Sequence, residues 1–459
     1  MLAGFSVGNY KSFKIQQNFS MIAGKSARHK SHIAIAGERK LLKSAFIYGA
    51  NAGGKSNFVN AADFSKRIII HGLDSVNLDK KYFRIDTDMY YQPGIFEYRI
   101  IVKGTEYSYG LVISYCKKII LAEWLTKFDK EGKEIYIINR ETDEEGKSCA
   151  WTEMEYENPD ENAKMKVYLS DFGEEISDLL QKKTILSDIA GRVSDRSSFF
   201  SDIVAVYEWF SNISVIFPDS KYTMLDFLTA DKKIRDFFGS MMAYFDTGIK
   251  NIQNQMQELD FDRLLQSLPA AKAEKLRMGI DSHTENEPFM MQINQKIYLL
   301  EKGEKGNLVY SKMLMNHGNV KELFEYLDES DGTKRLFDLI PVLIESMDKS
   351  VILIDEIDRS LHTNLIKKFL QIYYQLSPSA SCQLIATTHD SNLLDLDLLR
   401  QDELWFVERK QDHSSQLYSL SKFREQYGKE IDKEYLIGRY GAVPVFQSSF
   451  HFREEEDEE

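Results

Sequence analysis

Alternating apolar and polar positions predict strands in the first part of the chain. Residues 1–20 show this two-residue period, with a break at Gly8-Asn9. The segments 95–102 and 107–113 show it again and are joined by Lys103-Gly104-Thr105. A short connection with a glycine between two such segments is typical of a β-hairpin. We therefore expect antiparallel strands here.

Between about 160 and 305 the period changes to that of a helix. Apolar side chains recur every three or four residues over 200–210 and again over 234–245. Such a stripe is far more typical of a packed core than of a cofactor site. After residue 330, strands alternate with helices again, which is the mark of a parallel α/β sheet. We predict an α/β fold with a mixed sheet and an inserted helical domain.

The octapeptide Gly49–Ser56 has the pattern G-x-x-x-x-G-K-S of a phosphate-binding loop. An apolar strand precedes it and a helix can follow it, so a chance glycine-rich turn is a poor alternative. Glycines let backbone N–H groups approach phosphate oxygens, and the helix N-terminus adds its positive end. We expect Lys55 to bind the β- and γ-phosphates and Ser56 to ligate Mg²⁺. The ATP-binding residues predicted here are Gly49, Asn51, Ala52, Gly53, Gly54, Lys55, Ser56 and Asn57.

A continuous apolar run, Val351–Ile354, ends in the acids Asp355 and Glu356. A strand buried on both faces has this pattern, and α/β sheets bind ligands at the carboxyl ends of such strands. We expect Asp355 to hold Mg²⁺ and Glu356 to act as the general base that orients the attacking water. The alternative is an ordinary strand end whose acids begin the next helix.

The spacing of these two motifs predicts the domain organisation. Asp355 follows Lys55 by 300 residues, far more than one or two βαβ units require. Something large is therefore inserted between the two halves of the nucleotide site. We expect the first half of an ATPase head over 1–155, a mainly helical insertion over 156–305 and the second half of the head over 306–459.

Three further segments resemble parts of ABC-type ATPases. The strand that ends in Thr387-Thr388-His389 resembles the switch segment, whose histidine contacts the γ-phosphate. Ile357–His362 resembles a D-loop, and Asp358 is assigned to the ATP site on this basis. The stretch 328–335 resembles a divergent signature loop, in which Ser330 and Gly332 would meet the γ-phosphate bound by another copy. A capped helix start is the plainer interpretation of these two residues. The resemblance makes Lys55, Glu356 and His389 the catalytic set.

Taken together, the motifs resemble the AAA15-type, OLD-like ABC ATPases of bacterial anti-phage systems, which are related to SMC proteins. The opening 7–13, the segment 402–407 and the segment 435–444 continue the resemblance, whereas the middle of the chain matches poorly. The resemblance implies a head-to-head dimer or a higher homo-oligomer that uses ATP and Mg²⁺. It also implies a separate effector protein, as in two-gene PARIS-like systems where an ATPase holds a nuclease toxin, and a phage-derived trigger. Only 70 residues follow His389, so we expect no appended nuclease domain of the OLD kind.

Composition and charge narrow the alternatives. The net charge of −13 argues against a chain that binds DNA over its whole surface, although a local basic face stays open. The three cysteines form no CxxC pair, which fits a reducing compartment, and no apolar run is long enough to span a membrane. We expect a cytoplasmic protein without a membrane partner. The acidic run 453–459 is expected to be solvated and disordered.

Three rival functions remain at this point. The first is an SMC- or RecF-like DNA-repair ATPase, which salt-sensitive DNA binding would support. The second is an ABC transporter subunit, and the third is a scaffold that binds ATP without turnover. A second GKS sequence, Gly24-Lys25-Ser26, lacks the first glycine of the motif, and we interpret it as an exposed loop.

Overall fold

The structure is a computed structural model that divides into two compact units. The first comprises 1–217, 346–358 and 366–459, and the second comprises 218–345 and 359–365. The residues that it describes are 1–128, 131–143, 145–173, 176–193, 199–219, 232–258, 261–266, 270, 273–274, 277–278, 289–293, 296–302, 308–319, 321–345, 350–376, 382–423 and 430–444. The acidic run 453–459 lies outside them.

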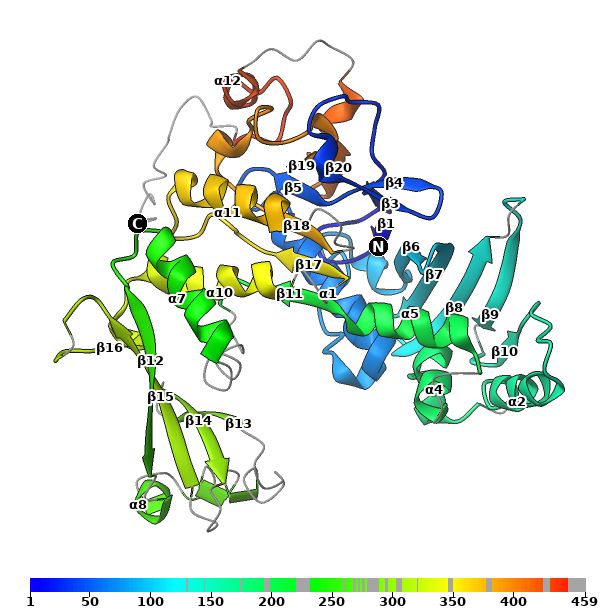
Figure 1. Cartoon of the computed structure of the whole chain (residues 1–459). Coiled ribbons are helices and arrows are strands. Elements are labelled where there is room, and N and C mark those ends of the chain that lie inside the picture. Colours follow the sequence, from blue (N-terminus) through cyan, green and yellow to red (C-terminus); the bar gives the residue numbers. More distant parts are fainter. Residues whose placement is uncertain are drawn as a thin grey trace, which may run out of the picture. The chain divides into compact units, whose positions relative to one another are not determined.

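A six-stranded sheet forms the centre of the first unit (Figure 1). Its order is β11 (Ile213–Ile216), β17 (Val351–Ile354), β18 (Gln383–Thr387), β5 (Ser44–Tyr48), β19 (Leu404–Arg409) and β20 (Ser415–Ser419). Neighbouring strands are parallel except for the antiparallel pair β19–β20. Every residue of β5, β17 and β18 is buried, which is why these strands are continuous apolar runs. The strands that precede the phosphate loop, the acids and the histidine are therefore neighbours in one mixed sheet.

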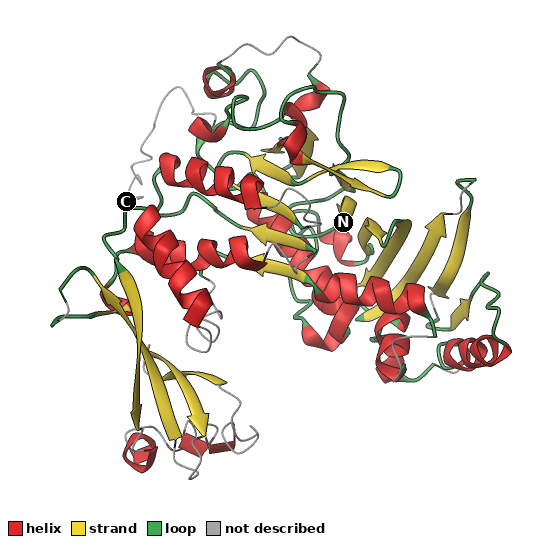
Figure 2. Cartoon of the chain, in the orientation of Figure 1, coloured by secondary structure: helices red, strands yellow, loops and turns green. Residues whose placement is uncertain are grey.

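A seven-stranded antiparallel sheet is the second layer of this unit (Figure 2). Its order is β10 (Ser148–Trp151), β9 (Glu134–Thr142), β8 (Ile119–Phe128), β7 (Thr105–Ser114), β6 (Gly94–Val102), β1 (Leu2–Gly8) and β2 (Gln17–Ser20). The hairpin predicted at Lys103-Gly104 joins β6 to β7. The second strand of the first hairpin begins at Gln17, and Phe13 in the preceding connection is buried. A small hairpin, β3 (Ile33–Ala36) and β4 (Arg39–Leu42), adds to the unit.

Helix α1 (Lys55–His71) packs into the hydrophobic core of this unit. Its ring of Phe58 packs on Phe5 of β1 and on Phe19 of β2, which ties the phosphate-loop helix to the second sheet. At α4 (Ile185–Arg192) the carboxylate of Glu123 in β8 accepts the N–H groups of Ile185 and Leu186, which caps that helix. The other helices are α2 (Pro159–Ser170), α3 (Asp178–Gln181), α4 (Ile185–Arg192), α5 (Ser201–Ser211), α11 (Thr363–Leu376), whose last eleven residues belong to this unit, and α12 (Ile431–Leu436).

The second unit combines a sheet with helices. The sheet has the order β12 (Asn251–Glu258), β15 (Leu308–Asn316), β14 (Lys296–Lys302) and β13 (Phe289–Ile293), and β16 (Phe324–Glu325) also pairs with β15. Helix α7 (Lys232–Tyr244) packs on α10 (Asp331–Glu345) through the rings of Phe238 and Phe337, whose centroids are 4.9 Å apart. A short helix, α8 (Phe261–Gln266), follows β12.

The expectation of a mainly helical insertion over 156–305 is wrong in two places. Residues 251–258, 289–293 and 296–302 form strands, and β11 lies within the central sheet of the first unit. The sequence of β12 has only two apolar residues, Ile252 and Met256, so the alternation that marks a strand is weak. Its pairing with β15, more than 50 residues away in the chain, is a tertiary contact that local propensity does not reveal.

Candidate functional site

The phosphate loop connects β5 to α1, in the strand–loop–helix order that the motif requires. Close packing leaves no space for a side chain at two glycines of this loop. A Cβ on Gly49 would lie 2.3 Å from the carbonyl oxygen of Val407, and one on Gly54 would lie 2.3 Å from Ser415 Oγ. Gly54 also has φ +116°, a conformation that other residues rarely adopt. These glycines therefore fit the loop against β19 and β20 as well as keeping its N–H groups accessible.

Lys55 is buried at the first position of α1. Its ammonium donates to the carbonyl of Gly49 at 2.6 Å and to that of Ala50 at 3.2 Å, and it lies 3.2 Å from Nδ1 of His389. Burial lowers the pKa of Lys55 to about 8, although Asp358, Asp355 and Glu356 act in the opposite direction. The positive charge is thus held at a helix N-terminus, in the low-dielectric setting where a phosphate would gain most from it.

The two acids after β17 are joined to the next strand by one hydroxyl group. Thr387 Oγ1 of β18 donates to Asp355 Oδ1 at 2.6 Å and accepts the backbone N–H of Glu356 at 2.8 Å. Glu356 has φ +51°, in the left-handed region, at a cost of about 1–3 kcal/mol. Strain of this kind persists where the surroundings fix the backbone, and it concentrates at functional sites. Only its place at a strand end marks Thr387 in the sequence, and that does not predict its bridging role.

Asp358 and His389, two residues assigned by resemblance, lie together. The carboxylate of Asp358 accepts the backbone N–H of His389 at 3.1 and 3.3 Å. Desolvation and then the neighbouring Lys55 lower the pKa of His389. The imidazole is therefore neutral at pH 7, and a neutral ring can accept from Lys55 or donate to a phosphate oxygen. The structure thus brings Lys55, Asp355, Glu356, Asp358 and His389 into one group.

The remaining residues of the loop surround this group. Ala52 is exposed with φ +61°, Asn51 is exposed, and the carbonyl of Gly53 accepts Ser415 Oγ at 2.6 Å. Asn57 donates from Nδ2 to Ser12 Oγ at 2.8 Å, which connects α1 to the segment between β1 and β2.

The residues present fit a magnesium ion. Mg²⁺ prefers oxygen ligands and usually takes only one or two from protein, with phosphate and water oxygens completing the octahedron. Ser56 and Asp355 offer a hydroxyl and a carboxylate. Within the part of the chain that the structure describes, no three His, Cys, Asp or Glu side chains form a metal-binding group.

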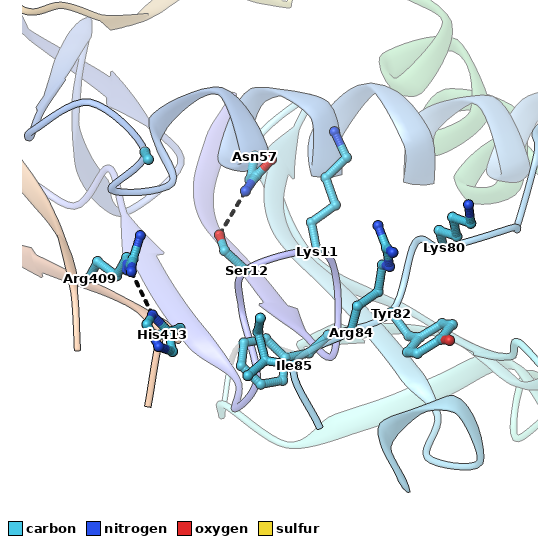
Figure 3. A pocket seen from close by; sticks show the side chains of 11 residues that line it. Lys11, Ser12, Asn57, Lys80, Tyr82, Arg84, Ile85, Arg409 and His413 are labelled. Atoms are coloured by element: carbon cyan, nitrogen blue, oxygen red, sulfur yellow. Dashed lines mark hydrogen bonds between the residues drawn. The ribbon is translucent and has the colours of Figure 1, made fainter. Parts of the chain in front are cut away.

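A pocket of about 630 Å³ opens beside the phosphate loop (Figure 3). Lys11, Arg84 and Arg409 give it positive charge, and Tyr82 and Phe83 give it aromatic surface. None of the described residues that line it is acidic. Of the described residues that line this pocket, only Ala52 and Asn57 were predicted from the sequence to bind ATP. Lys11 and Ser12 lie in the opening segment 7–13, which was noted only for its family resemblance. The other residues that line the pocket are Ser12, Ala52, Asn57, Lys80, Ile85 and His413.

Ser330 and Gly332 belong to the second unit, at the start of α10. Ser330 Oγ accepts the N–H of Thr333 at 3.1 Å, so the helix cap expected as the plainer interpretation is present. A Cβ on Gly332 would lie 2.9 Å from the carbonyl oxygen of Ser360, in the segment that resembles a D-loop. The first N–H groups of a 15-residue helix remain as potential anion donors here.

The second GKS sequence, Gly24-Lys25-Ser26, does not form a phosphate-binding loop. The buried guanidinium of Arg400 donates to the carbonyls of Gly24, Ser26 and Arg28. Three carbonyl oxygens of the loop therefore bind this guanidinium, and the N–H of Gly24 donates to Asp402 Oδ2 at 2.6 Å. These backbone groups are used within the protein and do not form a phosphate cradle.

The strand–loop–helix arrangement of Gly49–Ser56, with two acids at the end of a strand in the same parallel part of the sheet, is that of a P-loop nucleotide-binding α/β fold. The family model described as "AAA domain, putative AbiEii toxin, Type IV TA system" matches residues 183–395, which include the acids and the histidine but not the phosphate loop. No curated protein matches the sequence. None of the helices in the described segments is long and apolar enough to cross a membrane.

Solved structures of SMC heads are similar in outline. The SMC head domain from Thermotoga maritima is 12% identical, with a TM-score of 0.36, covering 91% of this chain and 98% of that one. An SMC head bound to the C-terminal winged-helix domain of ScpA is 14% identical, with a TM-score of 0.37, covering 92% and 99%. An SMC head with an extended coiled coil, bound to the C-terminal domain of ScpA from Pyrococcus furiosus, is 15% identical, with a TM-score of 0.32, covering 92% and 97%. Similarity at this level carries no information about function.

Proposed function

We propose that the chain binds ATP with Mg²⁺, hydrolyses it, and acts as a nucleotide-controlled switch in anti-phage defence that holds or releases a separate effector protein. One observation carries the enzymatic part. Three strand ends that are neighbours in the central sheet bring together Lys55, the acids bridged by Thr387, and His389. A lysine at a helix N-terminus, two acids and a histidine are the groups that phosphoryl transfer to water needs.

The roles follow from the chemistry of each group. Lys55 exchanges the carbonyls of Gly49 and Ala50 for β- and γ-phosphate oxygens, and Ser56 and Asp355 would hold the Mg²⁺. When bound, the ion neutralises charge on the phosphates. Glu356 accepts a proton from water as the water oxygen bonds to the γ-phosphorus and the bond to the β–γ bridging oxygen breaks. His389 donates to the γ-phosphate, while Asp358 fixes its backbone. The pocket of Figure 3 accommodates the ribose and base.

We further propose that two copies share each site, with Ser330 and Gly332 of one copy at the γ-phosphate held by the other. Mixing two inactive variants, Lys55→Ala and Ser330→Arg, tests this. A heterodimer then has one site with both lesions and one with neither, so hydrolysis should reappear on mixing. If no hydrolysis returns although subunit exchange is demonstrated, the sites are not shared. Should Ser330→Arg and Gly332→Asp each hydrolyse ATP like the wild type alone, the signature assignment is wrong.

The defence role rests on the motif resemblance and on the family description for 183–395. Expression with the neighbouring genes, followed by purification and mass spectrometry, tests it. We expect an effector protein that stays bound until phage infection and that is released in a way that Lys55→Ala prevents. Protection against phage that persists unchanged in Lys55→Ala cells would contradict the proposal.

DNA repair remains the second candidate because of one local feature. In a chain of net charge −13, residues 25–40 expose Lys25, Arg28, Lys30, Arg39 and Lys40 against one acid, Glu38. A DNA clamp would bind duplex DNA with an affinity that falls steeply with salt, and charge reversal at Lys25 and Lys30 would weaken it. Salt-independent or absent DNA binding removes this candidate.

A further inference from the structure

A histidine and a glutamate connect the sheet of the second unit to the start of α10. His317 directly follows β15, and its Nε2 lies 2.8 Å from Oε1 of Glu329. Glu329 immediately precedes Ser330, and its side chain is only 6% exposed. The two partners are 12 residues apart in the chain, so their hydrogen bond closes the whole connection between β15 and α10.

The imidazole is partly buried and has neighbours on two sides. Its ring meets that of Phe324 edge-on with centroids 4.9 Å apart, and Gly248 lies so near Nδ1 that an added Cβ would be 3.2 Å away. The strand end that carries His317 is fixed in turn by the N–H of Lys250, which donates to the carbonyl of Asn316 at 2.8 Å. The sheet therefore helps to fix the position of the donor, Nε2 of His317.

The acceptor determines where the helix begins. Glu329 is the residue before the N-cap, so its buried carboxylate fixes the chain entering α10. A displacement of Glu329 would carry Ser330 Oγ and the first N–H groups of the helix with it. Groups that stabilise a reacting phosphate lose much of their effect when they are misplaced by as little as 1 Å.

We propose that His317 is a positioning residue for the shared ATP site: through Glu329 it holds Ser330 and the N-terminus of α10 in the orientation that meets the γ-phosphate of the other copy. The inference rests on the proposed function, because it assigns a control on the same site. It predicts an effect on turnover and not on the binding of ATP to the phosphate loop, which lies in the other unit of the chain.

The test compares four variants by steady-state hydrolysis and by equilibrium ATP binding. His317→Ala should lower the maximal rate about tenfold or more while the dissociation constant for ATP changes less than about twofold. His317→Gln places an amide N–H near the position of Nε2 and should restore most of the rate, and Glu329→Gln keeps an acceptor and should behave similarly. Lys321→Ala, an exposed neighbour in the same connection, is the matched control and should equal the wild type.

The possible results distinguish the proposed ATPase function from the positioning role of His317. A wild-type protein that does not hydrolyse ATP defeats the proposed function. If the wild type hydrolyses ATP and His317→Ala stays within twofold of its rate, only the present inference fails. The inference also fails if His317→Gln hydrolyses ATP as slowly as His317→Ala. It fails as well if ATP affinity falls as much as the hydrolysis rate, because the His317 ring would then contribute only to folding. If His317→Ala does not fold, Glu329→Gln against Glu329→Ala provides the same comparison from the acceptor side.

Discussion

At Thr387 a single hydroxyl group organises both acids of the site. The hydroxyl donates a hydrogen bond to Asp355 and accepts one from the N–H of Glu356. It therefore orients both the proposed metal ligand and the proposed base. Glu356 keeps its left-handed backbone within this arrangement. A threonine at the end of a buried strand is common, and only the pairing of β17 with β18 reveals the function of this one.

We expect Thr387→Val, which keeps the volume, to cost about 1–3 kcal/mol of unfolding free energy because it withdraws a donor from a buried carboxylate. The rate of ATP hydrolysis should fall as well, because Asp355 and Glu356 lose their common partner. Denaturant unfolding and an ATPase assay measure the two effects, and Thr387→Ser, which retains the hydroxyl, is the control. A valine variant with the stability and rate of the serine variant would contradict the bridging role.

Lys55 makes nucleotide binding depend on pH. Its pKa is lowered to about 8 in this structure by burial, and a bound phosphate stabilises the ammonium and raises that pKa. Binding therefore takes up a proton above pH 8, so affinity is full below this value and falls as pH rises through it, by up to about tenfold per pH unit.

Titration of ATP binding between about pH 7 and about pH 10 checks this expectation, with Lys55→Arg as the control because arginine stays charged over the whole range. Affinity of the wild type that is flat over the range, or that rises with pH, would show that the burial of Lys55 does not govern binding.

The elements that could be predicted from sequence are those whose pattern is local. Strands β5, β17 and β18 are continuous apolar runs, α5 and α7 have helical stripes, and the turn between β6 and β7 contains its glycine. Strands β13 and β14 form a local hairpin that sequence analysis missed. Strand β12 could not be predicted, because its pairing partner β15 lies far away in the chain. The same holds for the lining of the pocket beside the phosphate loop, which comes from four separate segments.

The phosphate loop shows how an element depends on its neighbours. Gly49→Ala should destabilise the protein by about 1–3 kcal/mol, because the new methyl group meets the backbone carbonyl of Val407, which cannot rotate away as a side chain would. Gly191→Ala in α4 is the matched control: nothing lies within 4 Å of the added Cβ, and the change should be neutral or stabilise by up to about 1 kcal/mol. Thermal unfolding of both variants measures the difference. Equal melting temperatures would mean that the loop does not pack on β19 as described.

On the scale of the whole molecule, the site residues are divided between the two units. The phosphate loop, the acids and His389 belong to the first, and Ser330 and Gly332 belong to the second. The chain enters the second unit after β11 and returns at β17, two adjacent strands of the central sheet. This insertion, residues 218–345, accounts for part of the 300-residue spacing between Lys55 and Asp355, and the strands β6–β10 and helices α2–α5 of the first unit account for most of the rest.

Glu356→Gln tests directly whether this chain hydrolyses ATP with Glu356 as the base, when hydrolysis and ATP binding are measured side by side. We expect this variant to bind ATP like the wild type and to hydrolyse it at least about 10²-fold more slowly, whereas Lys55→Ala, run beside it, loses binding. If Glu356→Gln turns over ATP at the wild-type rate, Glu356 is not the base.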